Sequence, residues 1–249
     1  MISAFVITFN SEKYLRRCLE SLSFADEIIV VDSGSTDRTK EIAIDSGAKV
    51  IEKEFCGFSD KKEFAKNLCS YDWVVNIDAD EYIPYETADE IKNAIKNERY
   101  DAYIIPFRTY FQEREIKFGR HRNEFHIRLM KKRLNYGNES VHEKIINSSY
   151  TGTLKNYIIH TPYNSKEDIK TRAYRNAELA SQDKAHLNIL LLIIFMIFNP
   201  LFRFIKEYFI QFGLLDKSIG LYLAYYSSKE VFLKYFWGIK RKFSLFRPH

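Results

Sequence analysis

The sequence predicts an α/β protein with a mostly parallel, Rossmann-like sheet, followed by an amphipathic helical extension. Over residues 1–100, short apolar runs alternate with segments long enough to form helices. This alternation is typical of β-α-β units, whose right-handed crossovers make neighbouring strands parallel. Two of the apolar runs end in an acid, Asp32 and Asp78. The carboxyl edge of such a sheet is where ligands usually bind, so these acids indicate a site there.

The composition indicates one globular domain with an appendage. A chain of 249 residues is long for one small domain, and its apolar content of 46% is enough for a core. The charged content of 29% argues against disorder. Cys18, Cys56 and Cys69 are odd in number and lack metal-ligand spacing, so we expect a reducing cytosolic compartment rather than disulfides. The chain start has no basic n-region and is interpreted as a first strand, not a signal peptide.

The elements of the first hundred residues follow from periodicity and turn residues. Strands are expected where apolar, β-branched residues dominate, at 2–8, 28–32, 48–52 and 73–77. Helices are expected where apolar residues share one face, at 11–23, 37–46, 60–69 and 85–97. Together they form a β-α-β-α-β-α-β series in which three strands end in polar residues.

After Asp101 the pattern changes to strands without intervening helices. Apolar segments predict a smaller mixed-sheet region with strands at 102–107, 125–129, 141–146 and 154–160. Pro162 marks the boundary to a polar, helix-prone stretch at 166–186. We therefore predict a sheet domain at 1–165, with halves at 1–100 and 101–165, and a helical extension at 166–249.

The helical extension is basic and aromatic. The chain carries a net charge of +5, and residues 200–249 contain nine Lys or Arg against three Asp or Glu, with 14 of the 39 aromatic residues. Asn199-Pro200 is expected to end the apolar run 187–198, which leaves it too short for a bilayer that needs about 20 residues. Helices of this kind are typical of a membrane interface. The alternative is a helical cap buried against the sheet domain.

Asp78 and Asp80 form the only Asp-x-Asp pair in the chain. In an extended segment, residues two apart project to the same side, and the two carboxylates repel unless a cation lies between them. Mg²⁺ or Mn²⁺ with an oxygen-rich diphosphate suits that role, whereas the alternative is a solvated acidic turn. No GxGxxG or GxxxxGK[ST] motif is present, which argues against a dinucleotide or P-loop site.

Three stretches carry a resemblance to a known family: Thr8-Phe9-Asn10, Ile29 to Asp37 and Asn76 to Glu81. They resemble the family 2 glycosyltransferases of GT-A fold. More narrowly, the chain is similar to bacterial lipopolysaccharide-core β-glucosyltransferases. Further matches to this branch are the segments 57–62, 128–132, 141–143 and 199–204.

The resemblance implies a metal-assisted, inverting transfer from a nucleotide sugar such as UDP-glucose. The residues implied in donor binding are Thr8, Asn10, Asp32, Lys62, Asn67 and Asp78, with Lys66 as an alternative to Lys62. The metal, Mg²⁺ or Mn²⁺, would be held by Asp80 with Asp78, and His160 is a candidate third ligand or a structural histidine. The metal would act as a Lewis acid on the leaving diphosphate.

The acceptor side is expected to come from the second half of the sheet domain. Inversion needs a general base, and our candidate is Glu143 in Val141-His142-Glu143, with Glu81 the competitor on spacing alone. His142 is expected to orient Glu143. Guanidinium groups match phosphate geometry, so a diphosphate or an anionic acceptor could be bound by Arg120, Arg122 and Arg128.

These observations predict a transferase on the cytoplasmic face of the inner membrane, acting on a lipid-linked saccharide such as a lipopolysaccharide or lipooligosaccharide core. Two alternatives keep the same fold: a non-catalytic nucleotide-sugar-binding protein and a sugar nucleotidyltransferase. The intact Asp-Ala-Asp argues against the first, and the absence of a Gly-rich loop after the first strand argues against the second. The apolar helices beside the basic residues do not favour nucleic-acid binding.

Overall fold

The structure is a computed structural model that describes residues 1–137, 145–146, 148, 150–182, 184 and 187–244. The chain divides into two compact units. The sheet unit comprises residues 1–108 and 123–161, and the helical unit comprises residues 109–122 and 162–249. The segment 109–122, which the sequence pattern assigned to the sheet domain, therefore groups with the C-terminal helices.

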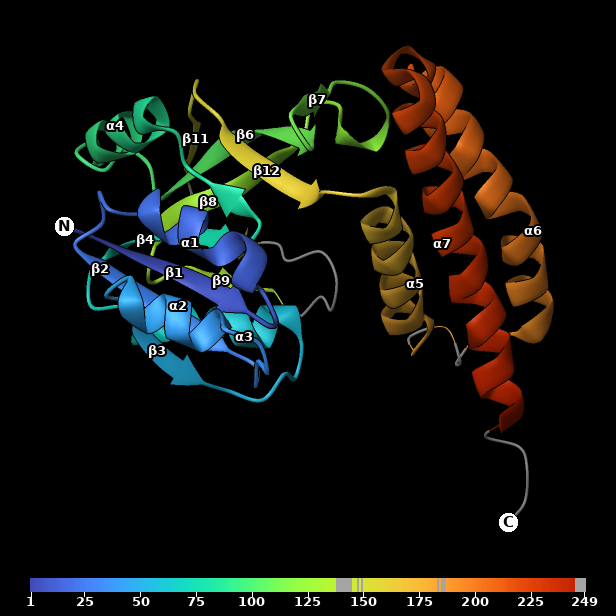
Figure 1. Cartoon of the computed structure of the whole chain (residues 1–249), viewed down its shortest axis with the longest axis horizontal. Coiled ribbons are helices and arrows are strands. Elements are labelled where there is room, and N and C mark those ends of the chain that lie inside the picture. The colour runs from blue at the N-terminus through green and yellow to red at the C-terminus, as the bar shows by residue number, and fades with distance from the viewer. Residues whose placement is uncertain (138–144, 147, 149, 183, 185–186, 245–249) are drawn as a thin grey trace. The chain divides into compact units, whose positions relative to one another are not determined.

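The sheet unit alternates strands and helices in its first part and is rich in strands in its second (Figure 1). The first part consists of β1 (Ile2–Thr8), α1 (Glu12–Glu20), β2 (Glu27–Asp32), α2 (Thr39–Asp45), β3 (Lys49–Glu52), α3 (Phe58–Leu68), β4 (Trp73–Asp78), β5 (Glu81–Tyr82) and α4 (Tyr85–Ala94). The second part contains β6 (Ala102–Phe111), β8 (Phe125–Lys131), β9 (Asn135–Tyr136), β10 (Ile145–Ile146), β11 (Thr151–Thr153) and β12 (Ile158–Tyr163). Strands β6 and β12 continue into the helical unit at their ends.

The strands follow the order β3-β2-β1-β4-β8-β6-β12-β5. The first four are parallel, with Thr8 opposite Asp32 and Ile7 opposite Asp78. Strand β8 then runs antiparallel to β4 and to β6. The predicted second sheet region is therefore not separate, because its strands extend the parallel sheet. This register brings the carboxyl ends of β1, β2 and β4 to one edge.

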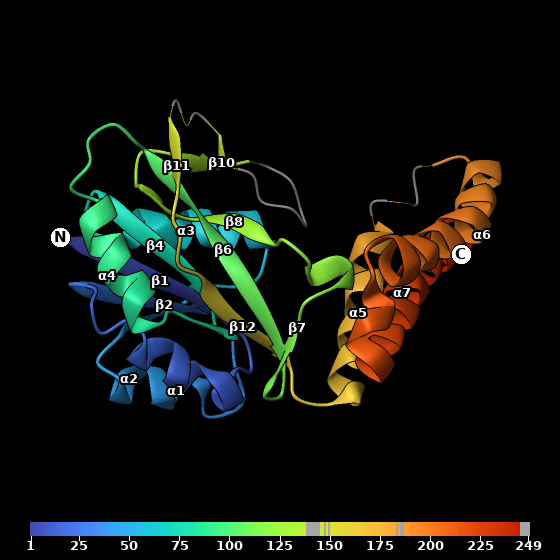
Figure 2. The same ribbon diagram turned by 90° about the horizontal axis from the view of Figure 1, so that it is seen from above.

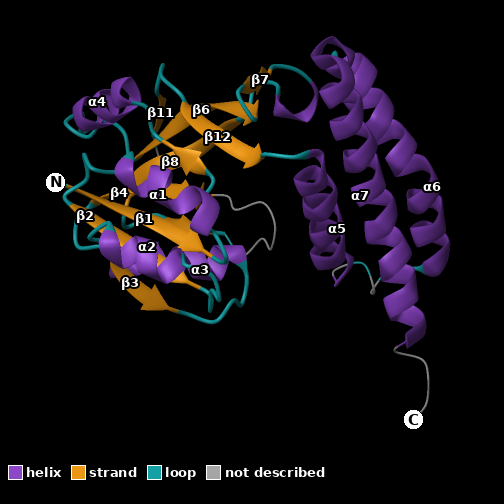
Figure 3. Cartoon of the chain, in the orientation of Figure 1, coloured by secondary structure: helices purple, strands orange, loops and turns teal. Residues whose placement is uncertain are grey.

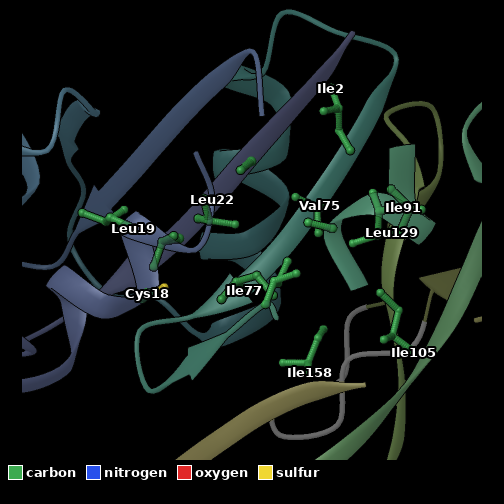
Figure 4. Packing of buried hydrophobic residues seen from close by; sticks show 14 of the residues in the cluster. Ile2, Cys18, Leu19, Leu22, Val75, Ile77, Ile91, Ile105, Leu129 and Ile158 are labelled. Atoms are coloured by element: carbon green, nitrogen blue, oxygen red, sulfur yellow. The ribbon is translucent and has the colours of Figure 1, made fainter. Parts of the chain in front are cut away.

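Both faces of the sheet are covered by helices, which explains why its central strands are apolar runs (Figure 3). Helices α1, α2 and α4 pack on one face, where Cys18, Leu22, Val75 and Ile77 belong to one buried cluster (Figure 4). Helix α3 packs on the other face through Ala65. Alternate residues of each strand supply the two clusters, as the pleat of a strand requires.

The helical unit is built from three long helices, α5 (Lys166–Gln182), α6 (Ile189–Ile205) and α7 (Lys217–Ser244). Strand β7 (Arg114–Ile116) pairs with the end of β6, and short turns lie at Gly119–His121, Lys206–Ile210 and Gly213–Asp216. Ile116, Tyr163 and Ile169 share a buried cluster with Ile219 and Leu223 of α7. Figure 2 shows α6 and α7 side by side.

Helix α6 differs from the sequence prediction because it continues through Pro200. The Pro200 carbonyl accepts a hydrogen bond from Ser228 Oγ of α7 at 2.8 Å, and the helix relaxes into a π turn at Lys206–Ile210. The resulting stretch, Ile189–Ile210, is the one described segment long and apolar enough to cross a membrane on length and composition alone. An 18-residue window within it has a mean hydropathy of 2.1, and 11% of that window is buried.

Candidate functional site

Asp32 ends β2 as a fully buried carboxylate. Its Oδ1 accepts from the backbone N–H groups of Gly34, at 3.0 Å, and Ser35, at 2.7 Å. Its Oδ2 accepts from Thr8 Oγ1 at 3.0 Å and from Ser35 Oγ. Asp32 therefore fixes the loop after β2 against the end of β1. A nucleoside hydroxyl or N–H group would have to join or replace these hydrogen bonds.

Asn10 joins the same two loops from the other side. Its Oδ1 accepts from the Thr36 backbone N–H at 2.9 Å, and its own N–H donates to Ser35 Oγ at 2.8 Å. Asn10 has a φ of 47°, a left-handed conformation that asparagine tolerates better than most residues. The loop Thr8-Phe9-Asn10 is thus held in a defined shape before any ligand binds.

Lys61, which no sequence motif distinguishes from its neighbours, also supports this loop. It lies on α3, is 2% exposed, and its Nζ donates to the Thr8 carbonyl at 2.6 Å. Burial lowers the pKa of Lys61 to about 8, although Asp32 acts in the opposite direction. The segment 57–62 indicated a functional helix, but its pattern does not show that Lys61 and Lys62 both turn inward.

The acidic turn Asp78-Ala79-Asp80 follows β4 and leads directly into β5. The Asp80 carbonyl accepts from both the backbone N–H and the Oγ1 of Thr161, at 2.8 and 3.1 Å. The Asp78 backbone N–H donates to Glu81 Oε2 at 3.0 Å. Because β12 and Glu81 both hold the turn, its carboxylates lie on a supported backbone rather than on a mobile loop.

Two cations flank Asp78. Arg128 Nη2 donates to Asp78 Oδ2 at 2.8 Å, and Lys62 Nζ lies 3.2 Å from Asp78 Oδ1. Burial alone would raise the pKa of Asp78, but Arg128 and Lys62 outweigh it and hold this pKa well below its usual range. Asp78 therefore stays ionised, and its charge is compensated by side chains of α3 and β8.

Arg128 also donates to Glu81, and both side chains are buried. Burial raises the pKa of Glu81 to about 7 despite the guanidinium. Sequence reasoning treated Arg128 as a possible diphosphate or acceptor contact. In the structure it connects the two acids that flank the turn, so it acts here as the counter-ion of the acidic cluster.

His160 lies beside Asp80, with its Nε2 3.6 Å from Asp80 Oδ2. Burial lowers the pKa of His160, but Asp80 and then Glu81 outweigh it, so this pKa is raised. Its Nδ1 is buried, and no described atom is its hydrogen-bond partner. The pairing of β12 with β5 sets this contact, because His160 lies opposite Glu81 in the register.

The donor set at this edge fits a divalent cation in part. Within the described residues, no three His, Cys, Asp or Glu side chains are grouped to hold a metal. Asp80 and His160 form a neighbouring pair of ligand types, while Asp78 is engaged by Arg128 and Lys62. Mg²⁺ in substrate complexes typically uses one or two protein ligands together with phosphate oxygens and water. Asp80 and His160 are therefore the residues that would hold it.

Several predicted residues are not part of this cluster. Asn67 donates to Glu63 one turn earlier on α3, and Lys66 Nζ donates to the Leu134 carbonyl. Arg120 and Arg122 belong to the helical unit, where Arg120 pairs with Glu230 at 3.8 Å. Glu143 and His142 lie outside the described residues. Their assignments stay predictions.

The parallel strands β3-β2-β1-β4, continued by antiparallel strands, together with an Asp-x-Asp turn at their carboxyl edge, define the GT-A class of glycosyltransferase. The chain belongs to Glycosyl transferase family 2, whose pattern matches residues 3–157, more than half of the sequence. The S. aureus TarS 1-349 crystal structure resembles the chain with a TM-score of 0.51 and 17% identity, over 98% of this chain and 91% of that one. At this identity the likeness concerns the fold alone.

Curated relatives match a shorter segment. An uncharacterized glycosyltransferase of Rickettsia bellii is 45% identical over 104 residues, which cover 41% of this chain and 35% of that protein. The lipopolysaccharide core biosynthesis glycosyltransferase LpsC of Rhizobium meliloti is 45% identical over 85 residues, or 32% of each chain. The matched segment thus spans about a third of the length of these relatives. The family resemblance of the sequence is confirmed.

Proposed function

We propose that this family 2 glycosyltransferase moves a sugar, with glucose the first candidate, from a UDP-sugar to a lipid-linked saccharide. A lipopolysaccharide or lipooligosaccharide core at the cytoplasmic face of the inner membrane is the acceptor class we favour. The observation that carries the proposal is the ordered edge of the sheet. There the loops after β1 and β2 and the turn after β4 present buried, compensated carboxylates next to lysine and arginine.

The donor half of the reaction follows from the residues at this edge. Thr8, Asn10 and Asp32 are the residues that a nucleoside would contact, and hydrogen bonds already join their loops. Lys62 of α3 lies beside the acidic turn. There its positive charge can offset the charge of a diphosphate in addition to that of Asp78. A preorganised loop needs little rearrangement when the donor binds, which favours affinity.

A divalent cation would be held by Asp80 and His160. When bound, it supplies positive charge that stabilises the leaving diphosphate. The protein contribution is then to keep Asp78 ionised between Arg128 and Lys62 and to keep the turn fixed through Thr161. Support for the metal comes from the donor types and their proximity, and its role is part of the proposal.

The proposal for the acceptor half of the reaction rests mainly on the sequence. We propose Glu143 as the base that removes the proton of the acceptor hydroxyl while the bond from the sugar to the diphosphate breaks on the opposite face. The lipid-linked acceptor is supported by the name of the Rhizobium meliloti relative, a lipopolysaccharide core biosynthesis glycosyltransferase.

A donor screen tests the proposed reaction. The purified chain is incubated with UDP-glucose and related UDP-sugars, with core lipopolysaccharide as acceptor, and UDP release is measured with and without Mg²⁺ or Mn²⁺. Asp80→Ala should lower the metal-dependent rate about 100-fold or more, because a metal supplies several kcal/mol at the transition state. Asp72→Ala is the matched control, since Asp72 is exposed and precedes β4.

The outcomes separate the alternatives. UDP binding without release under every acceptor condition would favour a nucleotide-sugar-binding protein. Pyrophosphate release from UTP and a sugar phosphate would favour a nucleotidyltransferase. Equal rates in Asp80→Ala and Asp72→Ala would remove Asp80 from the reaction.

A further inference from the structure

The outer face of α6 is apolar along its whole length. Exposed members recur at helical spacing, and they include Leu190, Ile194, Ile197, Phe198, Leu201 and Phe202. Only Leu192 and Pro200 of this helix are buried. At 1.5 Å per residue, the segment Ile189–Ile210 is about 33 Å long. Soluble proteins rarely expose a continuous apolar surface of this size to solvent, so this face of α6 indicates a binding partner.

The acids of this region all turn inward. Glu207 is 2% exposed and its carboxylate accepts from Arg203 at 3.2 Å. Asp216 is 4% exposed and accepts two backbone N–H groups from the segment before Gly119. Glu230 pairs with Arg120 of the same unit at 3.8 Å. None of the three acids in residues 187–249 is therefore an exposed surface charge.

The basic residues of the same region include several that are exposed, namely Lys206, Lys217 and Lys240. The exposed surface is thus apolar and cationic, with its negative charges internal. An anionic lipid surface is complementary to both properties, because it offers an acyl boundary next to negative headgroups. A second copy of this chain would offer the same cationic charge and would repel it.

The packing of α7 decides how α6 can meet a bilayer. Hydrogen bonds join the two helices along their length, from Lys242 to Leu187, from Ser228 to Pro200 and from Ser227 to Glu207. The centre of the apolar segment therefore lies beside the part of α7 that carries Lys229, Glu230 and Lys234. Ionisable groups at the centre of a bilayer are costly. Spanning by α6 would either place these ionisable groups at the depth of the hydrocarbon core or separate the two helices.

We propose that the helical unit docks on an anionic bilayer surface with α6 lying in the plane of the interface rather than across the membrane. The outer face of α6 enters the boundary between headgroups and acyl chains, and the exposed lysines bind anionic headgroups. This docking goes beyond the transfer reaction and rests only on the surface of the helical unit. An assay without donor or acceptor therefore tests it separately from the proposed function.

The first experiment is co-sedimentation of the full chain with vesicles. The chain should bind vesicles of phosphatidylcholine mixed with phosphatidylglycerol more tightly than phosphatidylcholine alone, and added salt should weaken this preference. Ile197→Glu should lower the partition coefficient about tenfold or more, because it removes an apolar side chain that would enter the bilayer and adds a negative charge. Lys206→Gln should lower it about fivefold, the factor expected for one basic residue at an anionic surface.

Matched controls come from the sheet unit. Ile44 on α2 is 63% exposed, against 57% for Ile197, so Ile44→Glu makes the same change on an equally accessible residue. Lys92 on α4 is exposed like Lys206, which makes Lys92→Gln the charge control. Both controls should bind vesicles like the unchanged chain, and circular dichroism of all four variants should show the same folded helix content.

A depth measurement distinguishes in-plane docking from spanning. Phe198 lies near the middle of Ile189–Ile210, so Phe198→Trp places a fluorophore there, with the signal of the unchanged chain subtracted. In-plane docking predicts stronger quenching by lipids brominated near the glycerol end of the acyl chain. Stronger quenching by lipids brominated near the methyl end would overturn the in-plane arrangement.

Two further results would overturn the proposal that the apolar face of α6 docks on lipid. One is equal vesicle binding by the unchanged chain and Ile197→Glu. The other is a chain that sediments as a dimer, does not bind vesicles, and becomes monomeric in Ile197→Glu, because a second copy would then cover the apolar face.

Discussion

Replacing Arg128 by methionine removes the guanidinium that pairs with both Asp78 and Glu81. Breaking a buried ion pair costs about 3–5 kcal/mol, because the remaining charge is left in a low-dielectric environment. Lys62 stays beside Asp78, and burial already raises the pKa of Glu81 to about 7, so Glu81 can take up a proton. We therefore expect the free energy of unfolding to fall by about 3 kcal/mol, near the lower end of this range. Against a total of about 5–15 kcal/mol for a folded domain, this loss is large.

The assay is urea unfolding of the full chain, in which tryptophan fluorescence monitors the sheet unit. Trp73 begins β4 and is 8% exposed, so its emission reports on the strand that leads to the acidic turn. A Trp237→Phe background removes the second tryptophan, which lies in α7. The variant Arg128→Met should shift the urea midpoint downward without changing the slope of the transition.

Two comparisons make the result specific. Arg38 forms a surface ion pair with Glu41 in which both side chains are more than half exposed, so Arg38→Met should leave the urea midpoint nearly unchanged. Adding Glu81→Gln to Arg128→Met should recover part of the loss, because the double variant no longer buries that unpaired acid. If Arg128→Met and Arg38→Met had the same urea midpoint, the buried ion pairs would not stabilise the acidic turn, and the reasoning would fail.

Two further predictions concern other parts of the chain. Lys61 has a pKa of about 8 in the folded chain, whereas its ordinary value is 10.5. Between these pH values the unfolded chain binds more protons, so the free energy of unfolding should rise with pH. Lys61→Met should abolish this rise in denaturant titrations at pH 8 to 10. A Cβ on Gly220 would lie 1.9 Å from the Gly213 carbonyl oxygen. Gly220→Ala should therefore destabilise the helical unit by about 3 kcal/mol, measured by thermal unfolding through Trp237 fluorescence. Ser218→Ala, on the exposed first turn of α7, should leave the transition unchanged, and an equal effect of both alanines would contradict the predicted clash.

The central strands could be predicted from the sequence because burial on both faces leaves few polar positions in them, among them Ser3 in β1 and Asn76 in β4. The expected strand at 2–8 coincides with β1, and that at 73–77 is one residue shorter than β4. Placing Asp32 and Asp78 at the same sheet edge followed from parallel topology alone, and the register confirms it. Local patterns of this kind do not depend on distant contacts.

Other features depend on distant contacts, and the sequence could not show them. Both carboxylate oxygens of Asp32 accept hydrogen bonds from Ser35 in the following loop, and Oδ2 also accepts one from Thr8 of β1. The second contact depends on the pairing of two strands that are distant in sequence. Arg128 was predicted to contact a diphosphate or an anionic acceptor, and this stays a prediction; its ion pair with Asp78 depends on the antiparallel pairing of β8 with β4, which the sequence does not show. Pro200 was expected to end a helix, but packing against Ser228 keeps α6 continuous. Each difference arises from a tertiary contact that overrides a local preference.

We propose that the turn at Asp78 and Asp80 binds a nucleotide diphosphate together with a divalent cation. The most direct measurement is calorimetric titration of UDP into the chain with and without Mn²⁺. We predict that Mn²⁺ strengthens UDP binding to the unchanged chain and to Asp72→Ala, and that Asp80→Ala abolishes this effect. Equal strengthening by Mn²⁺ in Asp80→Ala and Asp72→Ala would contradict the assignment of Asp80 as a metal ligand.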